Sequence, residues 1–206
     1  MTDQIISHYN KNAVKYLAQY DSVAASLVHA DWSTILKKLP PGLALDIGAG
    51  SGRDALWLAQ QGWTVTAVEP AEGLRRLGQQ KTGIEVKWVD AQLPTLEYLP
   101  TPSQGYDLIL LSAVWMHLNQ EQRSVALPRL KEILSPDGVM IITLRFGPSE
   151  PGRPMYSVSV EELSQLGEQY ALKVDEMSQT HTSDQLRRHE VSWKTLCLRQ
   201  PGEHHT

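Results

Sequence analysis

From residue 43 to residue 144, short apolar runs alternate with longer amphipathic stretches, and this alternation constrains the fold more than any other feature. The apolar runs have the length of buried strands, and the stretches between them repeat apolar residues at helical spacing. Strands alternating with helices predict right-handed βαβ units and a mostly parallel sheet covered on both faces. The expected strands are Leu43–Ile47, Thr64–Val68, Glu85–Val89, Tyr106–Leu111 and Val139–Leu144, and the expected helices are Arg53–Gln61, Ala71–Gln80, Thr95–Leu99 and Gln120–Leu134.

The segments on either side of this core have a different texture. Residues 3–39 read as helical, in two parts that meet near residue 22, and Pro40-Pro41-Gly42 separates them from the first strand. After the core, a helix is expected at Val160–Gln169 and strands at Leu172–Gln179 and Val191–Arg199. The last two strands lack a crossover helix, so they predict an antiparallel hairpin. The predicted fold is an α/β doubly wound sheet of seven strands, mostly parallel, with an antiparallel C-terminal edge hairpin.

Composition excludes several classes of protein. A chain of 206 residues with 41% hydrophobic and 20% charged residues is typical of one globular domain. Its single cysteine, Cys197, excludes an intramolecular disulfide and a cysteine-based zinc cluster, and it fits a reducing compartment. The formal net charge of −4 argues against a polyanionic ligand. Because neither a signal peptide nor 18 consecutive apolar residues are visible, we expect a cytoplasmic protein without a membrane partner.

The turn after the first strand is rich in glycine. Residues 43–54 read LALDIGAGSGRD, so an apolar strand runs into Asp46, then Gly48, Gly50 and Gly52, and then a helix. Glycine permits a tight turn and lets a ligand approach the backbone. The helix that follows offers unpaired N–H groups to an anionic or polar ligand group. In open α/β sheets, ligands bind beyond the carboxyl ends of such strands.

The spacing of these glycines separates two classes of ligand. The dinucleotide fingerprint G-x-G-x-x-G needs a third glycine for close packing of the helix on the strand. Counted from Gly48, that position holds Arg53. The spacing D-x-G-x-G-x-G is met instead, from Asp46 to Gly52. This pattern disfavours a nicotinamide oxidoreductase.

The string LDIGAGSGRDALWLA resembles the first motif of class I S-adenosylmethionine-dependent methyltransferases. Further motifs of that family are in register: acids end the second and third strands, Asp107–Ser112 matches the fourth strand, and Leu134–Gly138 matches the turn before the fifth. The resemblance implies a single Rossmann-like domain with N-terminal helices over the site. Within it, residues 1–40 would form a helical cap, 41–145 the cofactor-binding core, and 146–200 the acceptor-side loop, helix and hairpin.

The resemblance implies S-adenosyl-L-methionine as the cofactor. Glu69 stands where an acid accepts hydrogen bonds from ribose hydroxyls, although it is also placed to cap the next helix. Asp90 would lie near the adenine amino group, or serve as an ordinary turn residue. Asp46 would meet the ligand's amino group or brace the turn from beneath. Arg53 is a cation at an unfavourable helix end, so it indicates an anionic partner or a solvated surface side chain. The predicted cofactor-binding residues are Asp46, Gly48, Ala49, Gly50, Arg53, Asp54, Glu69, Pro70, Asp90, Ala91, Ser112 and Tyr9.

The segment after the fourth strand should face the transferred methyl group. Trp115 offers an aromatic face to a substrate or to the sulfonium cation. His117 has the ordinary pKa of a general base, so it is the candidate catalytic residue, with a merely orienting role as the alternative. Residues 145–156 form a lid or a rigid surface excursion. The predicted substrate residues are Tyr20, Trp115, His117 and Arg153, and no cluster has the spacing of a metal site.

The expected reaction is methyl transfer to an oxygen or nitrogen nucleophile of a small organic molecule. Enzymes acting on exocyclic base amines carry D/N-P-P-Y/F after the fourth strand, where this chain has Ser112-Ala-Val-Trp. Cytosine C5 enzymes need a cysteine there, and Cys197 lies far along the chain. DNA is therefore not the expected partner, and the protein is expected to be a monomer or homodimer. The alternatives left open are a non-catalytic cofactor-binding or regulatory module on the same fold, and an RNA or tRNA methyltransferase.

Overall fold

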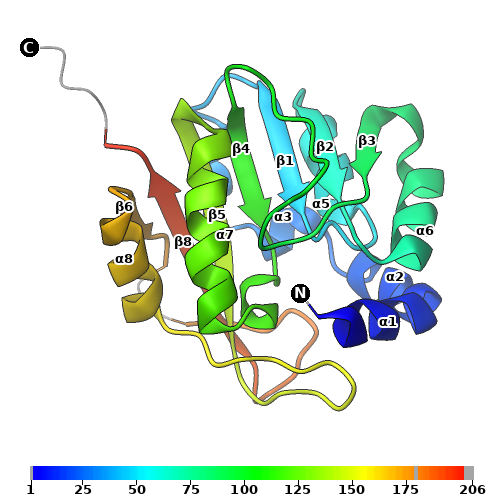
Figure 1. Ribbon diagram of the computed structural model, residues 1–206. Coiled ribbons are helices and arrows are strands. Elements are labelled where there is room, and N and C mark those ends of the chain that lie inside the picture. Colours follow the sequence, from blue (N-terminus) through cyan, green and yellow to red (C-terminus); the bar gives the residue numbers. More distant parts are fainter. Residues whose placement is uncertain (1, 179–180, 202–206) are drawn as a thin grey trace, which may run out of the picture.

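A computed structural model describes residues 2–178 and 181–201. The described strands form one sheet in the order β3-β2-β1-β4-β5-β8-β6, with β7 paired to β8 (Figure 1). The strands β1 to β5 run parallel, and β8 runs antiparallel to β5, β6 and β7. The strands are β1 (Leu43–Ile47), β2 (Thr64–Val68), β3 (Val86–Val89), β4 (Tyr106–Leu111), β5 (Leu134–Phe146), β6 (Lys173–Glu176), β7 (Thr182–Ser183) and β8 (Ser192–Arg199).

Helices cover both faces of this sheet, as Figure 1 shows for α7 in front and α5 behind. Successive side chains of a strand point to opposite faces. In β4, Ile109 and Leu111 therefore pack with α7, and Leu108 and Leu110 pack with α5. The α-helices are α1 (Asp3–Lys11), α2 (Ala13–Asp21), α3 (Ala25–Val28), α4 (Ser33–Leu36), α5 (Arg53–Ala59), α6 (Glu72–Thr82), α7 (Gln120–Ile133) and α8 (Val160–Gln169), with 3-10 turns η1 (Gly83–Glu85) and η2 (Trp115–His117).

The predicted fold class is confirmed. The order of the parallel strands reverses between β1 and β4, which defines the crevice where ligands bind in sheets of this kind. The C-terminal hairpin is present, because β6 and β8 pair antiparallel and β8 lies between β5 and the edge strand β6. The predicted strand Leu172–Gln179 is shorter at both ends, and Gln179 lies outside the described residues.

Three local predictions were wrong. Residues 95–99 form turns, because Leu96 and Tyr98 have φ angles of 53° and 64° that a right-handed helix excludes. Residues 22–39 hold two four-residue helices, interrupted where His29 and Trp32 turn into the core. The turn expected at 134–138 belongs to β5, since its first residue already pairs with the start of β4 across a register shift. The structure also has a short strand that was not predicted, β7, in the polar segment before β8.

The N-terminal helices pack against α6 at the carboxyl end of the parallel strands, as predicted from the resemblance (Figure 1). The side-chain oxygen Oδ1 of Asn10 accepts a hydrogen bond from the Gly73 amide at 2.8 Å. A side chain at Gly73 would lie 3.1 Å from the Cβ of Ala13, so glycine permits this close approach. The loop after β5 lies on the same side (Figure 1), and a Cβ on its Gly152 would lie 2.7 Å from His8. Among the described residues, no helix has the length and apolar character to span a bilayer.

Candidate functional site

Three cavities open at the carboxyl end of the parallel strands, among the described residues. We call them the turn cavity, the Asp90 cavity and the arginine cavity. The turn cavity is lined chiefly by the glycine turn, by Glu69 and Pro70, and by Tyr9, Tyr20, Ser112 and His117. It shares Ile6 and Pro70 with the Asp90 cavity. It shares Tyr20, Arg53, Ser112 and Ala113 with the arginine cavity, so the three form a continuous row.

The glycine turn forms the floor of the turn cavity. Gly48 and Gly50 have φ angles of 70° and 55°, which favour glycine. Both Gly48 and Ala49 donate their amide hydrogens to the carbonyl of Val68, at 2.8 and 3.0 Å. A Cβ on Gly48 would lie 2.6 Å from the side chain of Val114, and one on Gly50 would lie 3.2 Å from the ring of Tyr20. The missing side chains therefore leave a cradle in which a ligand can contact the backbone.

Glu69 lies in the wall of the turn cavity with both carboxylate oxygens engaged. Oε2 accepts a hydrogen bond from the Gly50 amide at 2.9 Å, and Oε1 accepts one from the Ala71 amide at 2.8 Å. Burial raises the pKa of this carboxyl to about 7 against the opposing effect of these bonds. Each carboxylate oxygen has a further lone pair, so the side chain can hold the turn and still accept from a ligand hydroxyl.

Arg53 and Asp54 form an ion pair at the start of α5. The guanidinium Nε lies 2.7 Å from Oδ1 of Asp54, and Nη1 donates to the carbonyl of Tyr20 at 3.0 Å. Buried His29 lies 3.1 Å from Oδ2 of Asp54, and its other ring nitrogen accepts a bond from Trp32. Burial alone would raise the pKa of Asp54, but His29 and Arg53 lower it below its usual range. The anionic partner expected for Arg53 is thus an acidic side chain of the same chain.

Asp46 lies beneath the turn and lines none of the three cavities. It is buried, and one oxygen accepts from the Ala55 amide, while Oδ2 has no hydrogen-bond partner in the part of the chain that the structure describes. Burial and the neighbouring Asp54 raise its pKa well above the usual range. Of the two roles expected for Asp46, this position matches support of the turn. The other role, direct contact with a ligand, stays a prediction that this position does not favour.

The Asp90 cavity brings together the residues at the ends of β2 and β3. Pro70, Asp90 and Ala91 line it, together with the turns that follow. The Asp90 carboxylate forms an ion pair with Arg75 at 2.9 Å but remains largely exposed. Asp90 is therefore accessible to a ligand that occupies the neighbouring turn cavity.

A hydrogen-bonded chain joins the N-terminal cap to the segment after β4. Nη1 of Arg153 donates to the hydroxyl of Tyr9 at 2.9 Å, and that hydroxyl lies 3.1 Å from Nε2 of His117. Nδ1 of His117 lies 3.3 Å from the carbonyl of Pro154. A carbonyl oxygen can only accept, so Nδ1 carries the hydrogen that meets Pro154. In the neutral ring Nε2 is then the acceptor, and the Tyr9 hydroxyl donates to it. Both nitrogens of a neutral imidazole are then engaged.

The surroundings of His117 disfavour its cationic form. Burial, followed by the positive charge of Arg153, lowers its pKa to about 4. The ring lies at the wall of the turn cavity but is almost fully covered. This arrangement matches the orienting role better than general base catalysis, because a base needs a free lone pair facing its substrate.

The structure places Trp115 away from the cavities, which does not match the position expected for a substrate residue. Its ring is fully buried in the core between the sheet and α7, and it lines none of the three cavities. The guanidinium of Arg123 lies 5.9 Å from the ring centroid, so this aromatic face is already covered. The 3-10 turn at Trp115–His117 turns the tryptophan inward, and Ser112 and Ala113 occupy the border between the turn and arginine cavities instead.

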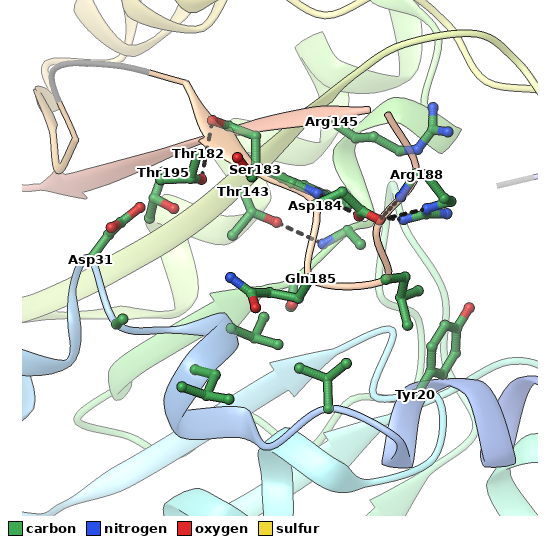
Figure 2. Close-up of a pocket in the computed structure, with 18 of the residues that line it drawn as sticks. Tyr20, Asp31, Thr143, Arg145, Thr182, Ser183, Asp184, Gln185, Arg188 and Thr195 are labelled. Atoms are coloured by element: carbon green, nitrogen blue, oxygen red, sulfur yellow. Dashed lines mark hydrogen bonds and ion pairs between the residues drawn. The ribbon is translucent and has the colours of Figure 1, made fainter. Parts of the chain in front are cut away.

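Sequence reasoning missed most of the arginine cavity, which measures about 190 Å³. Figure 2 shows Arg145, Asp184 and Arg188 gathered on one side and Asp31 at the other, with Thr143 and Thr195 between them. The segment before β8 supplies several of these residues. Because β8 runs antiparallel to β5, the residues that precede it lie at the carboxyl end of the parallel strands. That topology is readable from sequence, whereas the direction of each polar side chain is not.

Among the described residues, no group of three or more His, Cys, Asp or Glu side chains is arranged to hold a metal ion. The predicted site residues Tyr9, Gly48, Ala49, Gly50, Arg53, Asp54, Glu69, Pro70, Ser112 and His117 line the turn cavity together. Tyr20 lies at the border of the turn and arginine cavities, and Arg153 lines only the arginine cavity.

The comparisons with known proteins all find similarity to methyltransferases. Residues 45–142 match a family described as a methyltransferase domain. An uncharacterized methyltransferase of Alkaliphilus oremlandii is 33% identical over 101 residues, which are 49% of this chain and 44% of that protein. A thiopurine S-methyltransferase of Vibrio campbellii is 26% identical over 205 residues, covering 88% of this chain and 90% of that protein. The chain spans about half the length of several curated relatives that it matches (44, 56 and 54%).

The solved structures agree with the sequence matches. The 1,6-didemethyltoxoflavin-N1-methyltransferase of Burkholderia thailandensis has a TM-score of 0.70 at 20% identity, covering 94% of this chain and 88% of that one. The fold is therefore that of the Rossmann-like methyltransferases. The resemblance carried by the motifs is confirmed: residues 45–142 match a methyltransferase domain, and the chain is similar to methyltransferases in sequence and in fold.

Proposed function

We propose that this protein binds S-adenosyl-L-methionine and transfers its methyl group to an oxygen or nitrogen nucleophile of a small organic molecule. The observation that carries the proposal is the row of joined cavities. The turn and Asp90 cavities hold the residues of the cofactor motifs, and the arginine cavity adjoins them at Ser112 and Ala113. Cofactor and acceptor would thus meet at the carboxyl end of β4.

The residues present fit the cofactor. The cradle above Gly48 and Gly50 accepts a group close to the backbone, because a Cβ at either position would contact Val114 or Tyr20. Glu69 would accept hydrogen bonds from ribose hydroxyls, and Asp90 would lie beside the adenine. When bound, the cofactor supplies an activated methyl group on a cationic sulfur.

The contribution of the chain is to align and enclose the two partners. Two reactants held in register react as if at effective concentrations of about 10⁵ M or more. Tyr20 and Arg53 line both the turn and arginine cavities, and Arg153 joins the loop after β5 to Tyr9 of the cap. These contacts from three parts of the chain would exclude water from the reacting atoms. Because both ring nitrogens of His117 are engaged, the role proposed for it is to position Tyr9 and the loop.

Known relatives support a small acceptor. Structures with the same fold include, besides the enzyme of Burkholderia thailandensis, the magnesium protoporphyrin IX methyltransferase of Synechocystis, whose TM-score is 0.65 at 19% identity. A sulfur nucleophile is the second candidate. It is favoured because the relative of Vibrio campbellii that matches along nearly its whole length is a thiopurine S-methyltransferase.

Ligand binding to the purified protein tests the cofactor. At a concentration of 100 Kd, a ligand that binds only the folded state stabilises it by about 2.7 kcal/mol. S-adenosylhomocysteine should raise the melting temperature, whereas NAD should not. Stabilisation by NAD alone would overturn the proposal. A screen of hydroxyl, amine and thiol metabolites for release of S-adenosylhomocysteine then tests catalysis. Binding without turnover on any of them would favour a non-catalytic module, and turnover on tRNA alone would favour an RNA methyltransferase.

A further inference from the structure

Three arginines and two acids meet at one side of the arginine cavity. Arg145, Arg153 and Arg188 line the cavity, as does Asp184, while Glu150 connects the three guanidinium groups from behind. We call these five residues the arginine cluster. Figure 2 shows Arg188 joined to Asp184, with Arg145, from another part of the chain, on the same side of the cavity. At neutral pH the arginine cluster carries three positive and two negative charges.

The two acids of the arginine cluster pair closely with Arg188 and Arg153 but only weakly with Arg145. Asp184 is bound by Arg188 at 2.8 and 3.0 Å and by the indole N–H of Trp193 at 3.0 Å. Glu150 is bound closely by Arg153, at 2.6 Å. Arg145 reaches Glu150 only at 3.5 Å, and its other bond is to the carbonyl of Pro148.

Arg145 is consequently the least neutralised cation of the cluster. Its side chain is 3% exposed, and its Nε has no hydrogen-bond partner among residues 2–178 and 181–201. Burial, followed by the charge of Arg188, lowers the pKa of Arg145. A buried charge without a full partner destabilises the fold unless an anion completes the pairing.

The rest of the arginine cavity is suited to the apolar part of a ligand. Val23, Leu27 and Val28 form one wall, and Met116 and Trp193 add further apolar surface. Leu27 is largely exposed, which places an apolar side chain at the entrance. Asp31 lies at the side opposite Arg145 (Figure 2), so the electrostatic potential changes across the cavity.

We propose that the methyl acceptor is an organic carboxylate, with its carboxylate bound by Arg145 and Arg188 and its apolar body against Val23 and Leu27. This inference rests on the proposed function. Arg188 already donates to Asp184 and Glu150, and Arg145 to Pro148 and Glu150. A guanidinium carries five N–H donors, so each arginine keeps N–H groups that can make charge-assisted hydrogen bonds to a carboxylate. Anchored there, the acceptor would present its nucleophile toward Ser112 and Ala113, where the arginine cavity meets the turn cavity. A cofactor held in the turn and Asp90 cavities would not bring its carboxylate to Arg145 and Arg188, because these two line only the arginine cavity.

Matched ligand pairs test this without any mutation. Benzoate with benzamide, nicotinate with nicotinamide, and hexanoate with hexanamide are titrated by ligand-observed NMR, with and without saturating S-adenosylhomocysteine. At least one carboxylate should bind about tenfold or more tightly than its amide, and more tightly than inorganic phosphate. Equal affinities within all pairs, absence of binding by all carboxylates, or a preference for phosphate would overturn the inference.

Two variants localise the site. Arg188→Gln makes the cluster neutral and should abolish the preference for the carboxylate, whereas Arg187→Gln changes an exposed neighbour outside the cavity and should preserve it. Arg145→Lys should retain part of the preference that Arg145→Gln loses. An unchanged preference in both Arg188→Gln and Arg145→Gln would contradict the proposed site. Failure of S-adenosylhomocysteine to bind would count against the proposed function alone, because the carboxylate titrations without it still test the cluster.

Discussion

The hydroxyl of Tyr9 lies 3.1 Å from Nε2 of His117, although 108 residues separate the two in the chain. Their rings meet nearly edge to face, with centroids 5.8 Å apart. The same hydroxyl accepts a bond from Arg153, so it links the N-terminal cap, the segment after β4 and the loop after β5. Three elements that enclose the candidate site are thus held through one oxygen atom.

Removing that oxygen tests its structural importance. In Tyr9→Phe, the buried Arg153 and His117 both lose a partner, and an unmade bond to a charged group costs about 1.5–3 kcal/mol. We expect a loss of that order in the free energy of unfolding, together with weaker cofactor binding. Tyr98→Phe is the control, because Tyr98 is 89% exposed, and it should change stability by less than about 0.5 kcal/mol. Equal stability of the two variants in urea denaturation would refute the link.

The depressed pKa of His117 predicts a pH-dependent stability. The unfolded state takes up a proton near pH 6.5 and the folded state only near pH 4, so this group stabilises the fold above pH 6.5. The contribution is lost as the pH falls through that window, and it amounts to about 3 kcal/mol in total. We expect the free energy of unfolding of the wild type to fall by that amount relative to His117→Gln between pH 6.5 and pH 4. Parallel pH profiles for the two proteins would show that His117 titrates normally.

The same residue can be tested in catalysis. If His117 orients the loop, His117→Gln should weaken acceptor binding. The pH profile of the single-turnover rate should keep the shape that it has in the wild type. A general base would instead be revealed by a rate loss of about 10²-fold or more and by disappearance of a titration from the wild-type profile. Because both ring nitrogens are engaged, we expect the first result.

The raised pKa of Glu69 predicts pH-dependent cofactor binding. Ribose hydroxyls donate to the charged carboxylate, so the affinity for S-adenosylhomocysteine should rise with pH up to about 7 and then level off. Glu69→Gln should bind about tenfold or more weakly, without that rise. Glu72→Gln, three residues later in the exposed first turn of α6, should bind as the wild type does. Calorimetry at pH 6, 7 and 8 decides this, and lower stability with unchanged affinity in Glu69→Gln would mean that the acid only holds the turn.

Thr143 holds a strained residue at the border of the two cavities. Its Oγ1 accepts a hydrogen bond from the Ala113 amide at 2.8 Å, and Ala113 has a φ of 59° (Figure 2). Thr143→Val keeps the shape but leaves that amide without its acceptor, at a cost of about 1–3 kcal/mol. Thr143→Ser should restore most of the stability and of the methyl-transfer rate. Equal behaviour of the valine and serine variants, in thermal melts and in turnover, would show that the hydroxyl is dispensable.

The sequence by itself determined the sheet and the glycine turn, because both depend on local patterns. Apolar runs predicted β1, β2 and β4 to the residue, since a strand covered on both faces is mostly apolar. Gly48 and Gly50 marked the ligand turn because few other residues tolerate its dihedral angles.

Only the tertiary structure decided which side chains face the cavities. Trp115 and His117 lie two residues apart, yet a 3-10 turn buries one in the core and sets the other at the cavity wall. The arginine cluster joins the loop after β5 to the segment before β8, and neither segment has a pattern that indicates the other. Ionic contacts between distant segments depend on chain packing, and a packing of this kind leaves no periodic signal in the sequence.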